Sequence, residues 1–148
     1  MDLELIEPKA EQHEAVAAFF ARQAGEVDFA DEVYSPAKVH NVLALSAQGD
    51  WLRVAQNDQG AVIAFVHARL ECQQEEKTLH LILMAVDPDA RAMGLGRKIV
   101  LALQELAREQ GCGQIKLQVS EENRKAIGLF EASGYRTYQR AMALTLYN

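Results

Sequence analysis

Residues 86–97, with the sequence VDPDARAMGLGR, decide the fold of this 148-residue chain, because they link an apolar strand to an amphipathic helix. Gly94 and Gly96 let the backbone come close to a ligand, and Arg91 places a cation in the turn. The helix that follows points the positive end of its dipole, with unpaired backbone N–H groups, toward this turn. The stretch therefore predicts a binding site for an anion.

Length and composition limit the class of protein. A chain of 148 residues with 49% hydrophobic residues fits one domain, residues 1–148, with its own apolar core. No apolar run approaches the ~20 residues needed to cross a bilayer. Residues 1–5 are acidic where a signal peptide would be basic. We therefore expect a cytoplasmic protein that does not bind membranes.

The cysteines and the net charge exclude further classes. Cys72 and Cys112 are far apart in sequence and have no Cys/His cluster around them, which predicts reduced thiols and no metal site. The formal charge of −6 argues against nucleic-acid binding, which normally requires basic stripes. Cationic or small neutral partners fit better, although a negative surface also serves solubility alone.

The spacing of apolar residues predicts seven strands and four helices, in the order β-α-α-β-β-β-α-β-α-β-β. The strands are expected at residues 3–7, 51–55, 61–70, 78–86, 114–119, 135–139 and 141–146, and the helices at 11–24, 35–49, 95–111 and 123–133. Consecutive central strands favour antiparallel pairing, whereas a helix between Val86 and Gln114 requires a parallel pair. We predict the α/β (α+β) class with a mixed sheet.

The Gly94-Leu95-Gly96 turn does not match two common nucleotide-binding motifs. A dinucleotide fingerprint needs a third glycine where Ile99 stands, and a P-loop needs a Gly-Lys-Ser/Thr ending. Residues 91–96 are instead similar to the Gln/Arg-x-x-Gly-x-Gly/Ala signature of the GCN5-related N-acetyltransferases. Residues 123–135 resemble the second motif of that family, in which Asn begins a helix that ends at Gly-Phe or Gly-Tyr. The order of elements extends the resemblance to nearly the whole chain.

The resemblance implies the fold and ligands of that family. The fold is a mixed, mostly antiparallel sheet of about seven strands flanked by four helices. It has a V-shaped splay between strands 4 and 5, at residues 78–86 and 114–119. Acetyl-CoA is then the co-substrate, an amine is the acceptor, and no metal is required. A homodimer is compatible with the resemblance, which does not fix the oligomeric state.

The same resemblance implies a cofactor site. Backbone amides of residues 93–97 would bind the pyrophosphate, and the pantetheine arm would follow the end of the strand at residues 79–86. The amide near Val86 would face the thioester carbonyl. Asn123 would contact the pantetheine or a water, and it also fits a helix N-cap. The residues expected to bind the cofactor are Met84, Ala85, Val86, Arg91, Ala92, Met93, Gly94, Leu95, Gly96, Arg97, Asn123 and Phe130.

The implied reaction is direct attack of a neutral amine on the thioester, for which a base must take a proton. His80 is the expected base, because it lies six residues before Val86. This position matches a catalytic Glu in some histone acetyltransferases and a His in arylalkylamine acetyltransferases. Its ordinary pKa of ~6.5 suits proton transfer near neutral pH. The alternative for His80 is a partly exposed structural histidine. His67 has no such positional support, and we expect it to be structural.

Two positions depart from the family pattern. Phe130 stands where many members have a Tyr that protonates the leaving thiolate, and Tyr135 is expected only to pack. Gln118 stands where bacterial ribosomal-protein N-terminal acetyltransferases have a Glu, which argues against that subfamily. Two alternatives to a small-molecule enzyme therefore stay open. They are a non-catalytic acyl-CoA-binding module and a protein Lys or N-terminal acetyltransferase.

The connection between the first two helices suggests the kind of acceptor. In the family this region builds much of the acceptor pocket. Here it contains four carboxylates beside two aromatic residues: Glu26, Asp28, Asp31, Glu32, Phe29 and Tyr34. We therefore predict a small cationic amine with a second positive charge, the alternative being a plain solvated loop.

Overall fold

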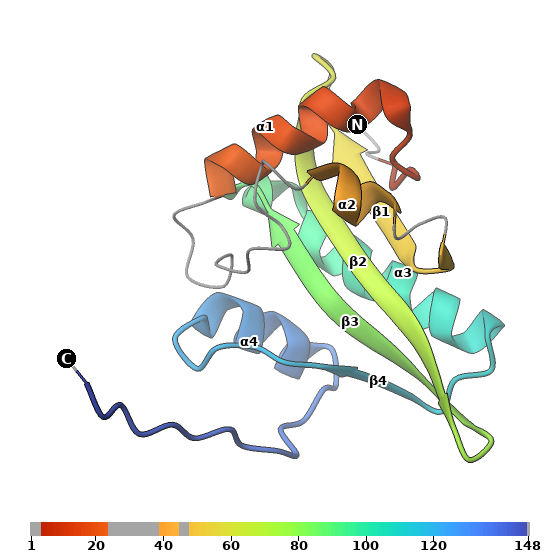
Figure 1. Cartoon of the computed structure of the whole chain (residues 1–148), viewed down its shortest axis with the longest axis vertical. Helices are drawn as coiled ribbons and strands as arrows, with labels where there is room; N and C mark the ends of the chain where they lie inside the picture. The colour runs from red at the N-terminus through yellow and green to blue at the C-terminus, as the bar shows by residue number, and fades with distance from the viewer. Residues whose placement is uncertain (1–3, 24–38, 45–47, 148) are drawn as a thin grey trace.

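The structure, a computed structural model, describes residues 4–23, 39–44 and 48–147. Its core is a mixed sheet (Figure 1). Its four described strands lie in the order β1-β2-β3-β4. They are β1 (Trp51–Gln56), β2 (Val62–Gln73), β3 (Glu76–Val86) and β4 (Gln114–Leu117). β1 to β3 pair antiparallel, whereas β4 pairs parallel to β3. The prediction of a mixed sheet is confirmed.

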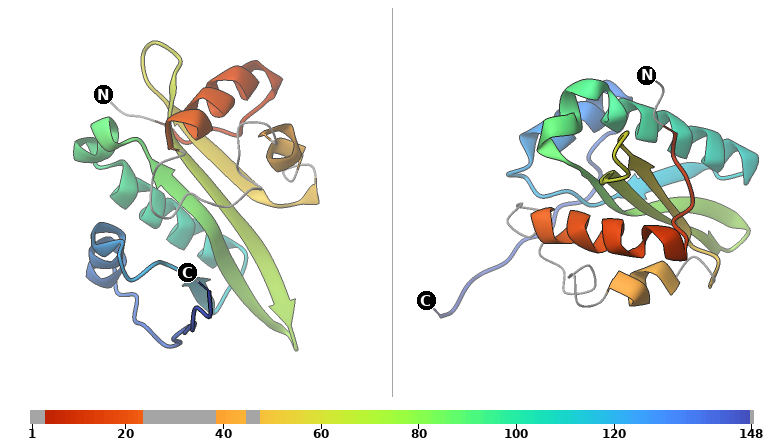
Figure 2. Two further views of the ribbon diagram at one scale, coloured as in Figure 1. Left: turned by 60° about the vertical axis from the view of Figure 1, so that its left-hand side comes forward. Right: turned by 90° about the horizontal axis from the view of Figure 1, so that it is seen from above.

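Helices cover both faces of this sheet (Figures 1 and 2). The first face is covered by α1 (His13–Gln23), which follows the short 3-10 helix η1 (Ala10–Gln12), and by α2 (Val39–Ala44). The opposite face holds α3 (Leu95–Glu109), with α4 (Arg124–Ala132) packed beside it. The 3-10 helix η5 (Pro88–Met93) joins β3 to α3. No helix among the described residues is long and apolar enough to span a bilayer.

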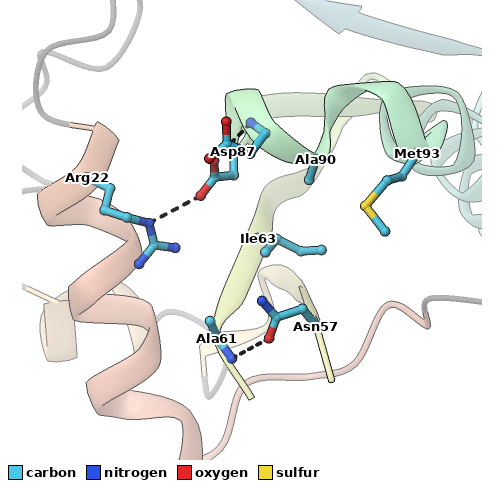
Figure 3. Close-up of a pocket in the computed structure, with 8 residues that line it drawn as sticks. Arg22, Asn57, Ala61, Ile63, Asp87, Ala90 and Met93 are labelled. Atoms are coloured by element: carbon cyan, nitrogen blue, oxygen red, sulfur yellow. Dashed lines mark hydrogen bonds and ion pairs between the residues drawn. The ribbon is translucent and has the colours of Figure 1, made fainter. Parts of the chain in front are cut away.

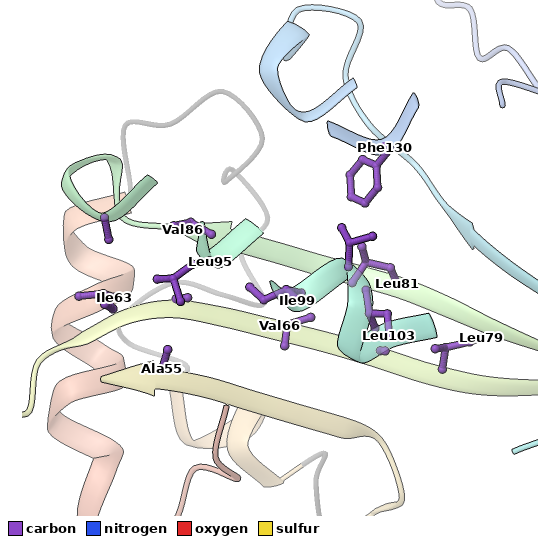
Figure 4. Packing of buried hydrophobic residues seen from close by; sticks show 14 of the residues in the cluster. Ala55, Ile63, Val66, Leu79, Leu81, Val86, Leu95, Ile99, Leu103 and Phe130 are labelled. Carbon is purple, nitrogen blue, oxygen red and sulfur yellow. The ribbon is translucent and has the colours of Figure 1, made fainter. Parts of the chain in front are cut away.

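Each face of the sheet has its own apolar cluster. On the α3 face, Leu95, Ile99 and Leu103 form the predicted helical stripe, and each is at most 1% exposed (Figure 4). On the α1 face, Phe20 packs edge-on against Phe65 with ring centroids 5.2 Å apart. The sheet is thus held between two apolar layers, and its middle strands are fixed from both sides.

A tight turn joins β2 to β3. Gln73 pairs with Glu76, so only Gln74 and Glu75 form the turn, with φ angles of 51° and 71°. Two left-handed turn residues suit the twist of a two-residue hairpin. The sequence predicts only a polar stretch at residues 71–77, because neither turn residue is Gly or Asn. The turn lengthens both strands and places Glu71 within β2.

The two ends of the chain differ from the prediction. The strand expected at residues 3–7 is reduced, in the part the structure describes, to a single bridge between Ile6 and Val54. The strands expected at residues 135–139 and 141–146 are not confirmed, because residues 136–147 pair with no strand in the described part of the chain. Alternating apolar residues form a strand only where a ladder partner is available. The predicted start of the second helix, Ser35-Pro36, lies outside the described residues.

Leu103 provides a test of the α3 face. It is 0% exposed, whereas Leu101 on the same helix is 55% exposed. We expect Leu103→Ala to lower the free energy of unfolding by about 2–5 kcal/mol, because the truncation leaves a cavity. Leu101→Ala should change it by less than about 0.5 kcal/mol. Equal losses in urea unfolding of the two variants would contradict the packing described.

Candidate active site

The connection between β3 and α3 has a sharply defined backbone. Asp87 caps η5, since its carboxylate accepts a hydrogen bond from the N–H of Asp89 at 3.2 Å, and Pro88 occupies the start of η5. The 3-10 helix ends at Gly94, which has φ 75° and ψ 16°. Glycine adopts this left-handed conformation without a steric penalty. α3 therefore starts at Leu95 immediately after a sharp change of direction.

Asp87 also ties this connection to the rest of the fold. Arg22, in the last turn of α1, donates from Nε to Asp87 Oδ2 at 3.2 Å (Figure 3). It also donates from Nη2 to the carbonyl of Val62 at 2.6 Å. The N–H of Asp87 donates to the carbonyl of Ile63 at 2.8 Å. These contacts fix the start of η5 against α1 and β2.

The N-terminus of α3 fits the predicted anion site. The N–H groups in the first turn of a helix have no intrahelical acceptor. No side chain caps α3, and its first turn contains no acidic residue. Arg91 and Arg97 are both exposed on this connection. Unpaired amides, a positive helix dipole and two guanidinium groups together favour a phosphate-bearing ligand.

Gly96 allows a close approach of α3 to its neighbours. A Cβ atom at this position would lie 3.1 Å from Leu129 Cδ2 and 3.5 Å from Met84 Cε. Leu129 is on α4, and Met84 is near the end of β3. The glycine therefore brings α4, α3 and β3 together beside the anion site, a packing role that sequence reasoning did not include.

A pocket of about 340 Å³ lies on the other side of η5, toward α1 and the β1–β2 turn (Figure 3). Its charged lining residues are Arg22, Asp87 and Asp89. Because Arg22 pairs with Asp87, their charges offset each other. The carboxylate of Asp89 then makes the lining acidic. This pocket is therefore a poor site for a phosphate, and the α3 N-terminus is the better one.

β3 and β4 part after four residue pairs. Thr78 to Leu81 pair with Gln114 to Leu117, whereas β3 stays paired with β2 as far as Val86. The splay expected between these strands is therefore present. At the same level, the ladder between β2 and β3 has a bulge. His67 pairs with Leu83 and Ala68 pairs with Leu81, so Ile82 has no opposite residue on β2. Residues 82–86 thus offer a β3 edge with no described strand beside it.

His80 lies one pair before this parting. Its Nδ1 is 2.9 Å from Glu71 Oε1, and Lys116 Nζ is 3.5 Å from the same oxygen. Glu71 Oε1 is buried and accepts no hydrogen bond in the described part of the chain. The two contacts are therefore ion pairs by distance, without hydrogen-bond geometry. The side chain of His80 is 27% exposed. His80, the expected base, therefore lies beside the point where β3 and β4 part, and solvent reaches its side chain.

Sequence reasoning missed Glu71 and Lys116 as neighbours of His80. The signal is in the strand registers, which pair His80 with Arg69 on one side and with Lys116 on the other. Glu71 is two residues beyond Arg69, on the same face of β2. Finding this arrangement from sequence would have required the position of the β2–β3 turn.

His67 has the structural role that the sequence predicts. It is 1% exposed, and its Nε2 lies 2.6 Å from Asp50 Oδ2, while Arg69 donates to the same carboxylate at 3.0 Å. Burial lowers the pKa of His67, against the opposing effect of Asp50. Burial alone would raise the pKa of Asp50, but hydrogen bonds from Arg69 and His67 hold it below its ordinary value.

α4 contains the remaining predicted residues. Asn123 is an N-cap, as expected, because its side chain accepts from the N–H of Ala126 at 3.1 Å. Phe130 is 7% exposed and packs edge-on against Tyr135, with ring centroids 5.2 Å apart. The Tyr135 hydroxyl is buried with no hydrogen-bond partner in the described structure, and burial raises its pKa. The predicted packing role of Tyr135 is confirmed.

Two further expectations concern metals and the acceptor. The described residues contain no group of three His, Cys, Asp or Glu side chains arranged for a metal ion. Cys72 and Cys112 are free thiols. The acidic connection at residues 26–32, with Tyr34, lies outside the described residues. The structure therefore describes the residues expected to bind the cofactor and His80, but not that connection.

These elements form an α/β domain whose mixed sheet splays between β3 and β4. The acetyltransferase (GNAT) family model matches residues 10–135, and the chain belongs to this family. A glucosamine 6-phosphate N-acetyltransferase of Trypanosoma brucei brucei is 36% identical over 67 residues, which are 45% of this chain and 44% of that protein. The match thus spans less than half of that relative.

Two solved structures share the fold. A Trypanosoma brucei acetyltransferase superposes with a TM-score of 0.74 at 23% identity, covering 98% of this chain and 100% of the other. AAC(6')-Iy, solved with the bisubstrate analog CoA-S-monomethyl-acetylneamine, has a TM-score of 0.69 at 18% identity, with both chains fully covered. At these identities the likeness establishes the fold alone.

The buried His67 predicts a loss of stability in acid. Its pKa is lowered in the folded protein, so the unfolded chain binds more protons once the pH falls below about 6.5. We expect the free energy of unfolding to decrease from pH 7 to pH 5, and His67→Gln to flatten that slope. Urea unfolding across this pH range measures both. A variant with the wild-type slope would show that His67 does not contribute.

Proposed function

We propose that this protein is an acetyl-CoA-dependent N-acetyltransferase that transfers an acetyl group to a primary amine. One observation supports this most strongly, namely that the start of α3, where Gly96 packs near Met84, adjoins the edge of β3 that has no described strand beside it. An extended ligand with a pyrophosphate at one end and an amide-rich arm matches this pairing of sites. Membership of the GNAT family supports the same donor.

The residues available for the donor fit its chemistry. The amides of residues 93–97, with Arg91 and Arg97, would bind the pyrophosphate. The N–H and C=O groups of residues 82–86 would pair with the pantetheine amides, as an added strand does. Asn123 and Phe130 would border the arm from α4. When bound, acetyl-CoA supplies an acyl group activated as a thioester, and a backbone amide near Val86 would stabilise the developing oxyanion.

His80 is the proposed base. In its neutral form the imidazole accepts a proton from the attacking amine, directly or through a water. The carboxylate of Glu71, 2.9 Å from Nδ1, stabilises the imidazolium that forms and restrains the ring. Phe130 has no proton to donate. The thiolate of CoA would therefore leave without a proton from a Tyr at this position. A thiolate can leave unprotonated more readily than an alkoxide, because a thiol has a much lower pKa than an alcohol.

The proposed acceptor is a small cationic amine. The named relative acetylates an amino sugar phosphate, and the CoA analog bound to AAC(6')-Iy contains acetylneamine, so amino groups on small molecules are acceptors among similar proteins. The net charge of −6 favours a cation over an anion as the second substrate. The carboxylates at residues 26–32 are proposed to provide part of this preference.

Phe130 also supports a second candidate function, a non-catalytic acyl-CoA-binding module. Such a module would keep the anion site and the open β3 edge but would not turn over. Incubation with acetyl-CoA and a library of amines, including peptide N-termini and lysine, separates the candidates when free thiol is measured. Thiol release that depends on an added amine supports the enzyme, and CoA binding without release supports the module.

Arg97 tests the location of the pyrophosphate. We expect Arg97→Glu to weaken CoA binding at least tenfold in calorimetry, because it places a carboxylate beside the phosphates. It should not lower thermal stability, since an acidic residue in the first turn favours the helix dipole.

Arg108→Glu is the matched control. It makes the same charge change in the last turn of α3 and should leave CoA affinity unchanged while lowering stability slightly. Equal CoA affinities for the two variants would refute the proposed site.

His80 tests the proposed base. His80→Gln should lower kcat by about 10²–10⁴-fold and leave the CoA dissociation constant unchanged, because the side chain is proposed to act in proton transfer. A variant that keeps the wild-type kcat would show that His80 is not the base and has a structural role instead.

A further inference from the structure

The pocket of about 340 Å³ between η5, α1 and the β1–β2 turn is not used by the proposed reaction. We call it the η5 pocket, and its volume is at the lower end of the usual range for small-molecule sites. Figure 3 shows Ile63 between Arg22 on one side and Met93 on the other. Ile63 is 7% and Ala90 is 4% exposed, whereas Met93 is 53% exposed. The η5 pocket therefore offers an apolar surface, part of it a flexible thioether, to a small ligand.

One carboxylate in the lining has no partner. Asp89 lies in the first turn of η5, where its backbone N–H donates to Asp87. The Asp89 side chain makes no hydrogen bond or ion pair with the described residues, and the cation in the lining, Arg22, pairs with Asp87 instead. A negative charge beside an apolar surface favours a ligand that brings its own positive charge.

Two donors with unused N–H groups line the same pocket. Oδ1 of Asn57 accepts from two backbone N–H groups of its own turn, both at 3.0 Å, which fixes the carboxamide and leaves Nδ2 as a donor. Figure 3 shows Nδ2 on the side toward Ile63. Arg22 uses Nε and Nη2 in the contacts described above, so Nη1 has no hydrogen-bond partner among the described residues. A carboxylate is the group that suits a guanidinium and a carboxamide donor together.

We propose that the η5 pocket binds a free amino acid with an apolar side chain. The ammonium group of the ligand pairs with Asp89, and its carboxylate accepts from Asn57 and Arg22. Its side chain covers Ile63 and Met93. A phosphate lacks the positive group that suits Asp89, and an aliphatic amine lacks the oxygen that suits Asn57, so only a zwitterion satisfies both ends of the pocket.

The η5 pocket is too far from His80 to hold the acceptor amine. His80 pairs with Arg69, whereas the β2 residue that lines the pocket is Ile63. Arg69 lies six residues beyond Ile63, which is about 20 Å of extended strand. The amino acid is therefore not the group that His80 deprotonates, and the η5 pocket is a second small-molecule site.

η5 connects this second site to the proposed donor site. Asp89 and Met93 line the pocket, and the backbone amide of Met93 begins the row expected to bind the pyrophosphate. A ligand that holds η5 from one side restrains the backbone that presents amides on the other side, so each ligand favours binding of the other. This coupling rests on the proposed function, whereas binding of the amino acid does not.

Calorimetry and NMR on the full chain without CoA test the amino-acid site. We expect L-leucine to bind and to shift the backbone amides of Asn57, Ala61, Asp89 and Ala90. 4-Methylpentanoate lacks the ammonium group and 3-methylbutylamine lacks the carboxylate, so each should bind about tenfold more weakly or worse. Absence of binding by L-leucine, L-valine and L-methionine overturns the proposal. Amide shifts centred elsewhere, or equal binding of L-leucine and either analogue, overturn it as well.

Two substitutions test the two ends of the ligand separately. Asp89→Asn removes the charge that pairs with the ammonium group. Asn57→Asp keeps the acceptor oxygen of its turn but replaces the Nδ2 donor with an oxygen that repels the carboxylate. Each should weaken L-leucine binding about tenfold or more. The matched control is Asp58→Asn, an exposed position in the same turn that does not line the pocket, and it should keep the wild-type affinity.

Wild-type affinity for L-leucine in Asp89→Asn would contradict the site. The side chain of Asp89 has no partner among the described residues, so this variant removes no contact on which folding depends. The coupling is measured separately. Saturating L-leucine should tighten CoA binding about fivefold or more. An unchanged CoA affinity overturns the coupling, and L-leucine binding to a chain that does not bind CoA overturns the proposed donor site instead.

Discussion

The unequal support of β3 on its two edges is the constraint on which the site depends. Along one edge β2 holds β3 from Glu76 to Val86, whereas along the other β4 holds it for only four residues. The strand therefore keeps its extended form after β4 has left it, and five residues of edge stay open. The cluster of His80, Glu71 and Lys116 lies at one end of this open edge, and the proposed anion site at Gly94 lies past the other.

The connection after β3 shows why a sharp turn needs support from outside. Gly94 supplies the left-handed backbone, but Asp87 fixes where the turn begins, through Arg22 of α1 and the Asp89 amide. A glycine is needed at position 96 for a different reason, because Leu129 and Met84 approach the backbone closely there. Two glycines two residues apart thus serve conformation and packing respectively, and both position the same helix N-terminus.

The sequence was sufficient to predict features that depend on local residue pattern. It was not sufficient for features that depend on which strands pair and in which register. The stripe of Leu95, Ile99 and Leu103, the cap at Asn123, and the mixed sheet all follow from short-range periodicity or turn chemistry. The cluster around His80 depends on strand register, which the unrecognised turn at Gln74 and Glu75 sets. Residues 136–147 alternate as a strand should, yet no described strand pairs with them, so the two strands that their pattern predicts are not found in the described structure.

The central claim is that the amides at the start of α3 and the open edge of β3 bind one ligand together. Amide chemical shifts of the labelled protein, followed by NMR during titration with CoA, test this most directly. The account predicts the largest changes at Leu95, Gly96 and Arg97 and along residues 82–86, with small changes at Asn57 and Ala61 in the neighbouring acidic pocket. Changes centred on that pocket, or none at the start of α3, would contradict it.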